Sequence, residues 1–182
     1  KAIAFGGDHS VSYPLIKAAA NFHPNLSVLH FDAHPDLYDQ FDGNPYSHAS
    51  PFARIMESGL AKRLVQVGIR AITAHQREQA KRFGVEVLTM RRWREVFETD
   101  FDPPLYVTFD MDCLDPAFAP GVSHWEPGGL STCEALSVLQ ALKTDIIGAD
   151  IVEFNPARDP QNITGMVAAK VFKEIAAAML RK

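Results

Sequence analysis

Apolar segments alternate with amphipathic segments along the whole chain. Short hydrophobic runs, typical of buried strands, are each followed by a segment in which apolar positions recur at helical spacing. Alternation of strands and helices favours a parallel sheet with helices on both faces. The pattern therefore predicts an α/β fold of three layers, α/β/α, with a mostly parallel sheet. The expected strands are residues 2–5, 26–32, 63–69, 85–90, 105–110 and 145–152, and the expected helices are 11–21, 49–58, 74–82, 92–98, 131–143 and 164–180.

Capping and turn residues support several of these boundaries. Ser131 is followed three residues later by Glu134, which is the spacing of a capping box at the start of a helix. Gly84 is suited to end the helix that precedes it. The polar segment 33–47, which is rich in proline and turn residues, is expected to form a long loop.

Two of the expected strands end in closely spaced acidic residues. The segments FDAHPD and FDMDCLDP place an acidic residue or a histidine at alternate positions. Residues two apart in an extended strand point the same way, and the carboxyl ends of parallel strands form the ligand-binding edge of such a sheet. Carboxylates this close repel one another unless a cation lies between them. The sequence therefore predicts a metal site built from Asp32, His34, Asp36, Asp110 and Asp112.

His9 is the candidate for a further imidazole ligand. It follows a glycine pair that allows a tight turn between a strand and a helix. Taken alone it would be assigned to a solvated loop, but beside the two acidic clusters we expect it to bind metal. A carboxylate-rich set favours Mn or Mg, and imidazole adds a preference for Mn, Fe, Co or Zn.

Composition and charge limit the classes of function. The net charge of −4 gives no basic surface for nucleic acid, and the apolar stretches are too short to span a bilayer. We therefore expect neither a nucleic-acid partner nor a membrane partner. Cys113 and Cys133 lack a CxxC spacing, which suits a reducing compartment, and we expect the cytoplasm. A single domain, residues 1–182, is expected, incomplete at its N-terminus because a core strand follows Lys1 directly.

Four motifs together resemble the ureohydrolase family, which includes the arginases and agmatinases. The motifs GGDHS, DAHxD, DxDxxDP and ExNP lie here at Gly6–Ser10, Asp32–Asp36, Asp110–Pro116 and Glu153–Pro156. The segments GNPYSHASPFARI and APGVSHWEPGGLS are most similar to plant-type arginases and agmatinase-like bacterial relatives. The resemblance extends over essentially the whole chain. In the family, further strands and helices precede GGDHS, and we expect them to be missing here, since only five residues of this sequence come before that motif.

The resemblance implies an arginase-like fold and two Mn²⁺ ions per chain. Each ion would have one histidine and one aspartate of its own, and two further aspartates would bridge both ions. Four carboxylates would then balance two dications. The first pair is His9 with Asp36, the second is His34 with Asp112, and the bridging residues are Asp32 and Asp110.

The resemblance also implies hydrolysis of a guanidino compound to urea and an amine. Asp110 would hold a proton during attack on the guanidinium carbon, and His48 would transfer a proton to the leaving amine. An exposed histidine at a helix start is the alternative for His48. Glu153 would bind the planar guanidinium through two parallel N–H bonds. The alternative for Glu153 is a structural ion pair with Arg158.

The loop before His48 bears on the choice of substrate. Residues 39–47 contain no Arg or Lys to pair with the α-carboxylate that distinguishes arginine from agmatine, so agmatine is favoured and arginine comes next. Asn44 and Ser47 are candidate substrate-binding residues, since they could bind a carboxylate without charge. A plant-type arginase acting on L-arginine is therefore the alternative.

Two further classes of protein are considered. A zinc deacylase would need one metal and a free pair of histidines, whereas the full ligand set is present here. A non-catalytic family member, acting as a binding or assembly subunit, should have lost a ligand, and none is missing. By family resemblance we expect a homo-oligomer, either a trimer or a hexamer, with a small guanidino molecule as the substrate.

Several other polar residues follow or precede these motifs. Asp150 is expected to support the site from the last strand. His30 is expected to be a packed strand residue, although it lies two positions before Asp32. The segment 124–126 either lines the mouth of the pocket or has a structural role in its loop.

Overall fold

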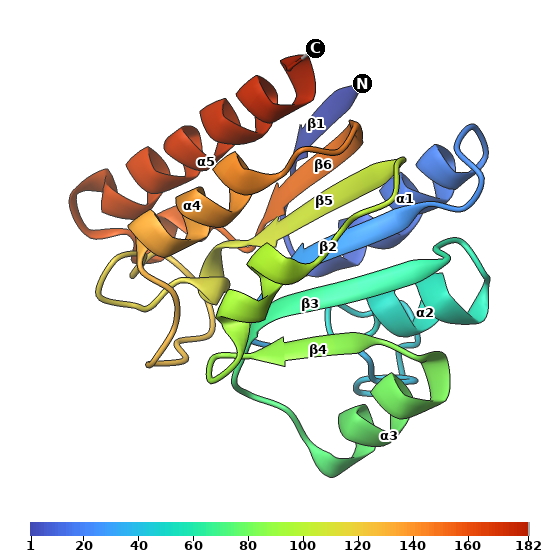
Figure 1. Cartoon of the computed structure of the whole chain (residues 1–182). Helices are drawn as coiled ribbons and strands as arrows, with labels where there is room; N and C mark the ends of the chain where they lie inside the picture. Colours follow the sequence, from blue (N-terminus) through green and yellow to red (C-terminus); the bar gives the residue numbers. More distant parts are fainter. Residues whose placement is uncertain (182) are drawn as a thin grey trace.

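A six-stranded sheet forms the centre of the computed structural model, which describes residues 1–181 (Figure 1). The strand order is β1-β6-β5-β2-β3-β4, and each neighbouring pair is parallel. The predicted parallel α/β fold is confirmed. The strands are β1 (Ala2–Phe5), β2 (Ser27–Phe31), β3 (Arg63–Ile69), β4 (Glu86–Thr89), β5 (Leu105–Asp110) and β6 (Ile146–Val152).

Helices cover both faces of the sheet, as Figure 1 shows. One face carries α1 (Ser12–Ala20), α2 (Pro51–Glu57) and α3 (Ala74–Phe83). The other face carries α4 (Thr132–Ala141) and α5 (Ile163–Leu180). Short 3-10 helices lie in the connections: η1 (His9–Val11), η2 (Trp93–Glu98), η3 (Met111–Cys113), η4 (Pro156–Arg158) and η5 (Pro160–Asn162).

The core has two parts, one on each face of the sheet. Leu29 and Phe31 of β2 belong to the cluster under α4 and α5, whereas Val28 belongs to the cluster under α1, α2 and α3. Every residue of β2 is buried. Burial on both faces explains why the inner strands appear in the sequence as continuous apolar runs rather than as alternating patterns.

One expected helix has a different geometry. The segment expected to be helical at 92–98 is the 3-10 helix η2, in which the buried residues Trp93 and Val96 are three apart. With three residues per turn, a 3-10 helix points both side chains toward the core. The capping box of Ser131 and Glu134 is confirmed at the start of α4. Gly84 ends α3 in the left-handed conformation, as predicted.

The sheet register brings the four motifs to one edge. Phe5, Ile151, Phe109 and Phe31 are partners in a row across β1, β6, β5 and β2. Each motif follows this row directly or within a few residues, and the strands are parallel, so all four motifs lie at the carboxyl end of the sheet. This is the position at which parallel α/β sheets bind ligands.

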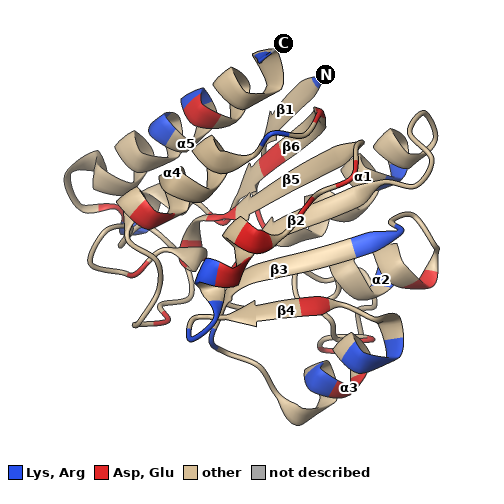
Figure 2. Cartoon of the chain, in the orientation of Figure 1, with Lys and Arg blue, Asp and Glu red and all other residues tan. Residues whose placement is uncertain are grey.

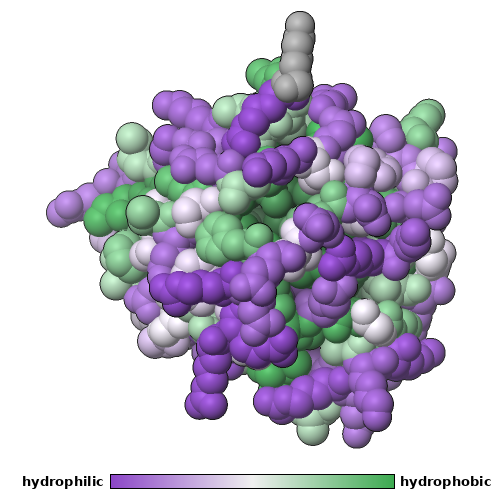
Figure 3. Space-filling model, viewed as in Figure 1, coloured by the Kyte–Doolittle hydropathy of each residue, from purple (hydrophilic) through white to green (hydrophobic). Residues whose placement is uncertain are grey.

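The surface is polar and of mixed character. Charged residues lie mainly on helices, loops and strand ends (Figure 2), and hydrophilic and hydrophobic residues are interspersed on the face seen in Figure 3. Within residues 1–181, none of the helices combines the length and the apolar character that crossing a bilayer requires.

Candidate metal centre

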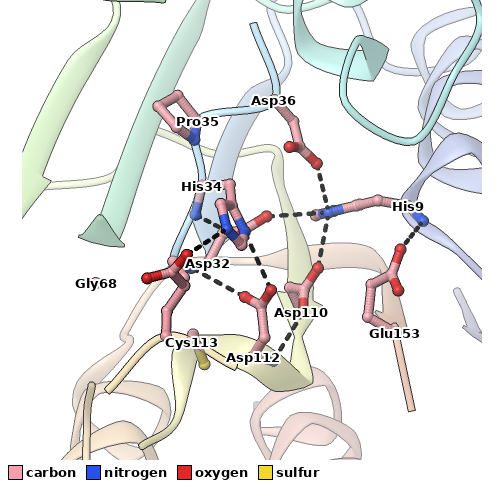
Figure 4. Close-up of polar contacts among 12 residues, drawn as sticks. His9, Asp32, His34, Pro35, Asp36, Gly68, Asp110, Asp112, Cys113 and Glu153 are labelled. Carbon is pink, nitrogen blue, oxygen red and sulfur yellow. Dashed lines mark hydrogen bonds and ion pairs between the residues drawn. The ribbon is translucent and has the colours of Figure 1, made fainter. Parts of the chain in front are cut away.

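His9 faces three carboxylates through a single ring nitrogen (Figure 4). Its Nδ1 lies 3.1 Å from Oδ2 of Asp32, 3.1 Å from Oδ2 of Asp36 and 3.2 Å from Oδ2 of Asp110. His9 is 1% exposed, and its Nδ1 has no hydrogen-bond partner among the described residues. Three carboxylate oxygens around a buried, unpartnered nitrogen are the donor set of a cation site.

A second group forms around His34 and shares Asp32 with the first. Nδ1 of His34 lies 3.1 Å from Oδ2 of Asp112 and 3.4 Å from Oδ1 of Asp32. Asp32 therefore presents one oxygen to His9 and the other to His34. Two groups of three residues each bring their ligand atoms within 4.8 Å of one another. One group is His9, His30 and Asp32, and the other is Asp32, His34 and Asp112. The geometry suits two cations held side by side.

The carboxylates show the electrostatic strain that a cation would relieve. Burial raises the pKa of Asp36 to about 6, and the charge on Asp32 adds to the shift. Burial also raises the pKa of Asp110 and of Asp112, and the neighbouring carboxylates add to both shifts. Cations between these groups would favour the ionised forms. The residues present therefore fit a pair of divalent ions.

The two histidines respond in the opposite sense. Burial opposes protonation of His34, but Asp112 and Asp32 outweigh it and raise the pKa of His34 to about 12. Burial likewise opposes protonation of His9, yet its three aspartate neighbours raise the pKa well above the ordinary value. In the metal-free protein, protonated imidazoles thus provide the positive charge that ions would provide in the loaded protein.

Residues behind His9 fix the direction of its ring. Thr108 donates from Oγ1 to Oδ1 of Asp150 at 2.6 Å, so that hydroxyl accepts from Nε2 of His9 at 3.0 Å. Asp150 also accepts from the hydroxyl of Tyr106 at 2.9 Å. Because Nε2 keeps its proton in this contact, Nδ1 is the nitrogen that faces the carboxylates, as an N–H in the metal-free protein and as a lone pair for a cation once that proton is lost. Asp150 thus supports the site from β6, as the sequence indicated.

Glu153 lies beside the centre in a constrained backbone conformation. Its φ is 62°, in the left-handed region, and its amide donates to the carbonyl oxygen of Gly7 at 2.8 Å. Its Oε1 accepts from the amide of His9 at 3.0 Å, and burial raises the pKa of its carboxyl group. The alternative ion pair with Arg158 is not formed, since Arg158 donates to the carbonyl oxygen of Ser123 at 2.9 Å.

An open cavity of about 360 Å³ lies against the centre and is lined by His34, Asp36, His48 and His124, among others. The rings of His48 and His124 are nearly parallel, with centroids 5.9 Å apart, and Phe41 contacts His48 edge-on at 5.6 Å. His48 is half-buried, and His124 is exposed. Of the two readings given for segment 124–126, the structure supports a place at the mouth of the pocket for His124.

The two candidate residues of the substrate loop make local hydrogen bonds. Oδ1 of Asn44 accepts from the amide of Tyr46 at 2.9 Å. The hydroxyl of Ser47 lies 3.0 Å from that of Ser50. Neither residue lines the cavity beside His48. A role for Asn44 and Ser47 in substrate binding therefore stays a prediction.

Sequence reasoning missed three polar contacts around the ligands. His30 is buried as expected, but its Nε2 also lies 2.7 Å from Oδ2 of Asp32, and burial lowers its pKa to about 4. Gln66 bonds to His30 from the neighbouring strand. Glu126 Oε1 lies 3.7 Å from Nε2 of His34. The available signals were the position of His30 two residues before Asp32 and a lone glutamine in the apolar run of β3.

Comparison with known proteins agrees with the resemblance that the four sequence motifs indicated. The arginase family model matches residues 1–178. Arginase 1, mitochondrial, from Arabidopsis thaliana is 54% identical over 96% of this chain and 54% of its own length. The structure of the arginase from Medicago truncatula matches with a TM-score of 0.92 and 53% identity, over 97% of this chain and 58% of that one. An agmatinase from Neisseria meningitidis is 38% identical over 96% of this chain and 58% of its own length. The chain thus spans about half the length of the curated relatives it matches.

The expectation of a cytoplasmic location is wrong in the light of these relatives. Plant arginases that are 52–54% identical are named mitochondrial, and one is named chloroplastic/mitochondrial. The expectation was drawn from two cysteines without a disulfide pattern. Free thiols argue against secreted and other oxidising environments, but they do not discriminate among reducing compartments.

Proposed function

Because the chain belongs to the arginase family, we propose that it carries the metal centre of a ureohydrolase that converts L-arginine to urea and ornithine. Family membership confirms the resemblance indicated by the four sequence motifs. The observation that carries the proposal is the double use of Asp32, whose two oxygens face His9 and His34 separately.

Arginine replaces agmatine as the favoured substrate. The relatives named arginase are 52–54% identical to this chain, whereas those named agmatinase are 37–38% identical. The preference for agmatine rested on the absence of Arg and Lys from residues 39–47. That argument is not supported, because neutral N–H and O–H donors also bind carboxylates.

Six residues would hold two Mn²⁺ ions. The donor set of four carboxylates and two imidazoles suits manganese. When bound, two such ions lower the pKa of water in the site and stabilise the charge that develops on the attacking oxygen. The residues are His9, Asp32, His34, Asp36, Asp110 and Asp112, of which Asp32 and Asp110 would be shared.

Three side chains would act on the substrate. The carboxylate of Glu153 would pair with the guanidinium and orient its carbon toward the centre. Asp110 accepts from the amide of Asp112 through Oδ1, which leaves Oδ2 to hold a proton on the side of the centre. His48, on the cavity wall, would transfer a proton to the leaving amine.

Urea release after incubation with Mn²⁺ tests the proposal. L-arginine, agmatine and 4-guanidinobutyrate should be compared at equal concentrations, with bound manganese measured in the same sample. We expect two ions per chain and the highest catalytic efficiency with L-arginine. Higher efficiency with agmatine would overturn the choice of substrate. Two bound ions without urea from any of the three would favour a non-catalytic binding or assembly subunit.

A further inference from the structure

His30 and Gln66 form a cross-strand pair behind the shared ligand Asp32. They are register partners in β2 and β3, and each is 0% exposed. Nε2 of His30 lies 2.7 Å from Oδ2 of Asp32, and the imidazole stacks on Phe52 with centroids 3.9 Å apart. The contact reaches the same oxygen of Asp32 that faces His9.

Gln66 determines which nitrogen of His30 carries the proton. Its Nε2 donates to the carbonyl oxygen of Pro35 at 2.6 Å and lies 3.0 Å from Nδ1 of His30. The reverse amide orientation would place Oε1 against the Pro35 oxygen, so a donor must face Nδ1. Nδ1 of His30 therefore accepts, and Nε2 donates its proton to Asp32.

The same amide also holds the loop that carries two other ligands. Pro35 lies between His34 and Asp36, so its bond to Gln66 fixes the backbone at the centre of that segment. Oε1 of Gln66 is buried and has no partner among the described residues. An unpaired buried acceptor lowers the stability of the folded state. The two hydrogen bonds donated by Nε2 offset this loss.

We propose that Gln66 and His30 are positioning residues that hold Asp32 and the His34–Asp36 segment in the geometry that binds two cations. The proposal rests on the metal-binding role proposed for these aspartates and histidines. It differs from direct ligation by His30, whose two nitrogens are already occupied by Gln66 and Asp32. It also differs from simple packing, because it depends on the direction of two N–H bonds.

Manganese titration of the metal-free protein by calorimetry tests the proposal without reference to turnover. Gln66→Leu removes both donated bonds, and His30→Phe keeps the stack on Phe52 but removes the donor to Asp32. We expect each to weaken Mn²⁺ binding by roughly 10–100-fold, as for other partners of metal ligands. The control is Gln79→Leu on α3, which deletes another buried amide and should leave the affinity unchanged. Affinities equal to that of the unsubstituted protein in both test variants would overturn the proposal.

Two further measurements separate positioning from packing and do not depend on a large core change. His30→Gln returns an amide donor near the place of Nε2 and should recover most of the affinity lost in His30→Phe. In the unsubstituted, metal-free protein, ¹⁵N shifts of labelled histidine should show His30 protonated at Nε2; protonation at Nδ1 instead would overturn the inference. If the unsubstituted protein binds manganese and releases urea while the variants bind equally well, only this inference fails. If the unsubstituted protein binds no manganese, the proposed function fails with it.

Discussion

Three of the four aspartates of the centre accept a backbone N–H through Oδ1. Oδ1 of Asp32 accepts from the amide of His34 at 2.6 Å, and Oδ1 of Asp110 accepts from the amide of Asp112 at 2.7 Å. Oδ1 of Asp112 accepts from the amide of Ala33 at 3.1 Å. These bonds fix each carboxylate before a cation arrives. At the scale of single residues, the orientation of three ligands is therefore held by backbone donors, two of them local and one from the neighbouring strand end.

His48 offers a test of chemistry apart from metal binding. It lines the cavity, but it is not one of the six residues that surround the proposed ions. We expect His48→Asn to leave manganese content unchanged and to lower kcat by roughly 10²–10⁴-fold, as for loss of a general acid–base. Steady-state assays on L-arginine, with metal analysis of the same preparation, give both values. Parallel loss of metal and activity would assign His48 to the metal centre.

Glu153 offers a second test, directed at recognition of the cation. Glu153→Gln keeps the shape and the capacity to accept from the amide of His9, but it removes the charge. A charge-assisted pair contributes about 1.5–3 kcal/mol, so kcat/KM for L-arginine should fall by at least about tenfold. Metal content should be unchanged. Near-normal kcat/KM on each guanidino substrate would make Glu153 structural, with its role limited to holding the amide of His9.

At the scale of elements, the sequence predicted most of the fold and only part of the site. Apolar runs identified β3 and β5 to the residue, because strands buried on both faces have clear ends. The pairing of His30 with Gln66 could not be predicted in this way, since it depends on the register between β2 and β3. The 3-10 geometry of η2 was also missed, because a short segment with buried residues three apart suits either type of helix.

Gly68 allows β3 to pass close to the backbone of the metal ligand Asp32 at the end of β2. Its φ is 97°, and an added Cβ would lie 2.9 Å from the carbonyl oxygen of Asp32. Gly59, with φ 62° and open space around the Cβ position, is a matched control. We expect Gly59→Ala to cost about 1–2 kcal/mol of unfolding free energy. Gly68→Ala should cost more, since it adds a clash with backbone, and it alone should weaken manganese binding.

Urea denaturation and manganese titration of the two glycine variants provide the comparison. Equal losses of stability with unchanged affinity in both would show that β3 can move away from Asp32 without disturbing the centre. A loss of affinity in Gly59→Ala would point to a general loosening of the fold rather than to the close approach at Gly68.

At the scale of the whole molecule, four adjacent parallel strands place the charged residues of the site at one edge of the sheet. β1, β6, β5 and β2 are adjacent in the sheet. The ends of β2 and β5 bring four buried aspartates together from separate parts of the sequence, and the ends of β1 and β6 add His9 and Glu153. Folding must therefore bring like charges together before any ion binds. The metal-free protein compensates with protonated histidines and with raised carboxyl pKa values, which makes its stability dependent on pH.

Chelation should lower the melting temperature. Ligands that bind only the folded state stabilise it, by about 2.7 kcal/mol per site at one hundred times Kd. For a chain of this size, that corresponds to roughly 5–11 °C per site. Thermal unfolding with excess Mn²⁺ and with EDTA measures the difference, and identical melting temperatures would contradict a metal centre that is coupled to folding.

The stabilisation by manganese should also grow with pH. A group whose pKa is raised by folding stabilises the protein fully below its unfolded pKa, and this contribution is lost as pH rises through the folded pKa. For Asp36 the loss lies between 3.8 and about 6, and for His34 between 6.5 and about 12. Above pH 6.5 the metal-free protein should therefore lose stability as the contribution of His34 is lost, whereas metal binding, which needs deprotonated ligands, should strengthen. Melting temperatures with and without Mn²⁺ should diverge across this range. A constant or narrowing difference would mean that these histidines and aspartates do not exchange protons for metal.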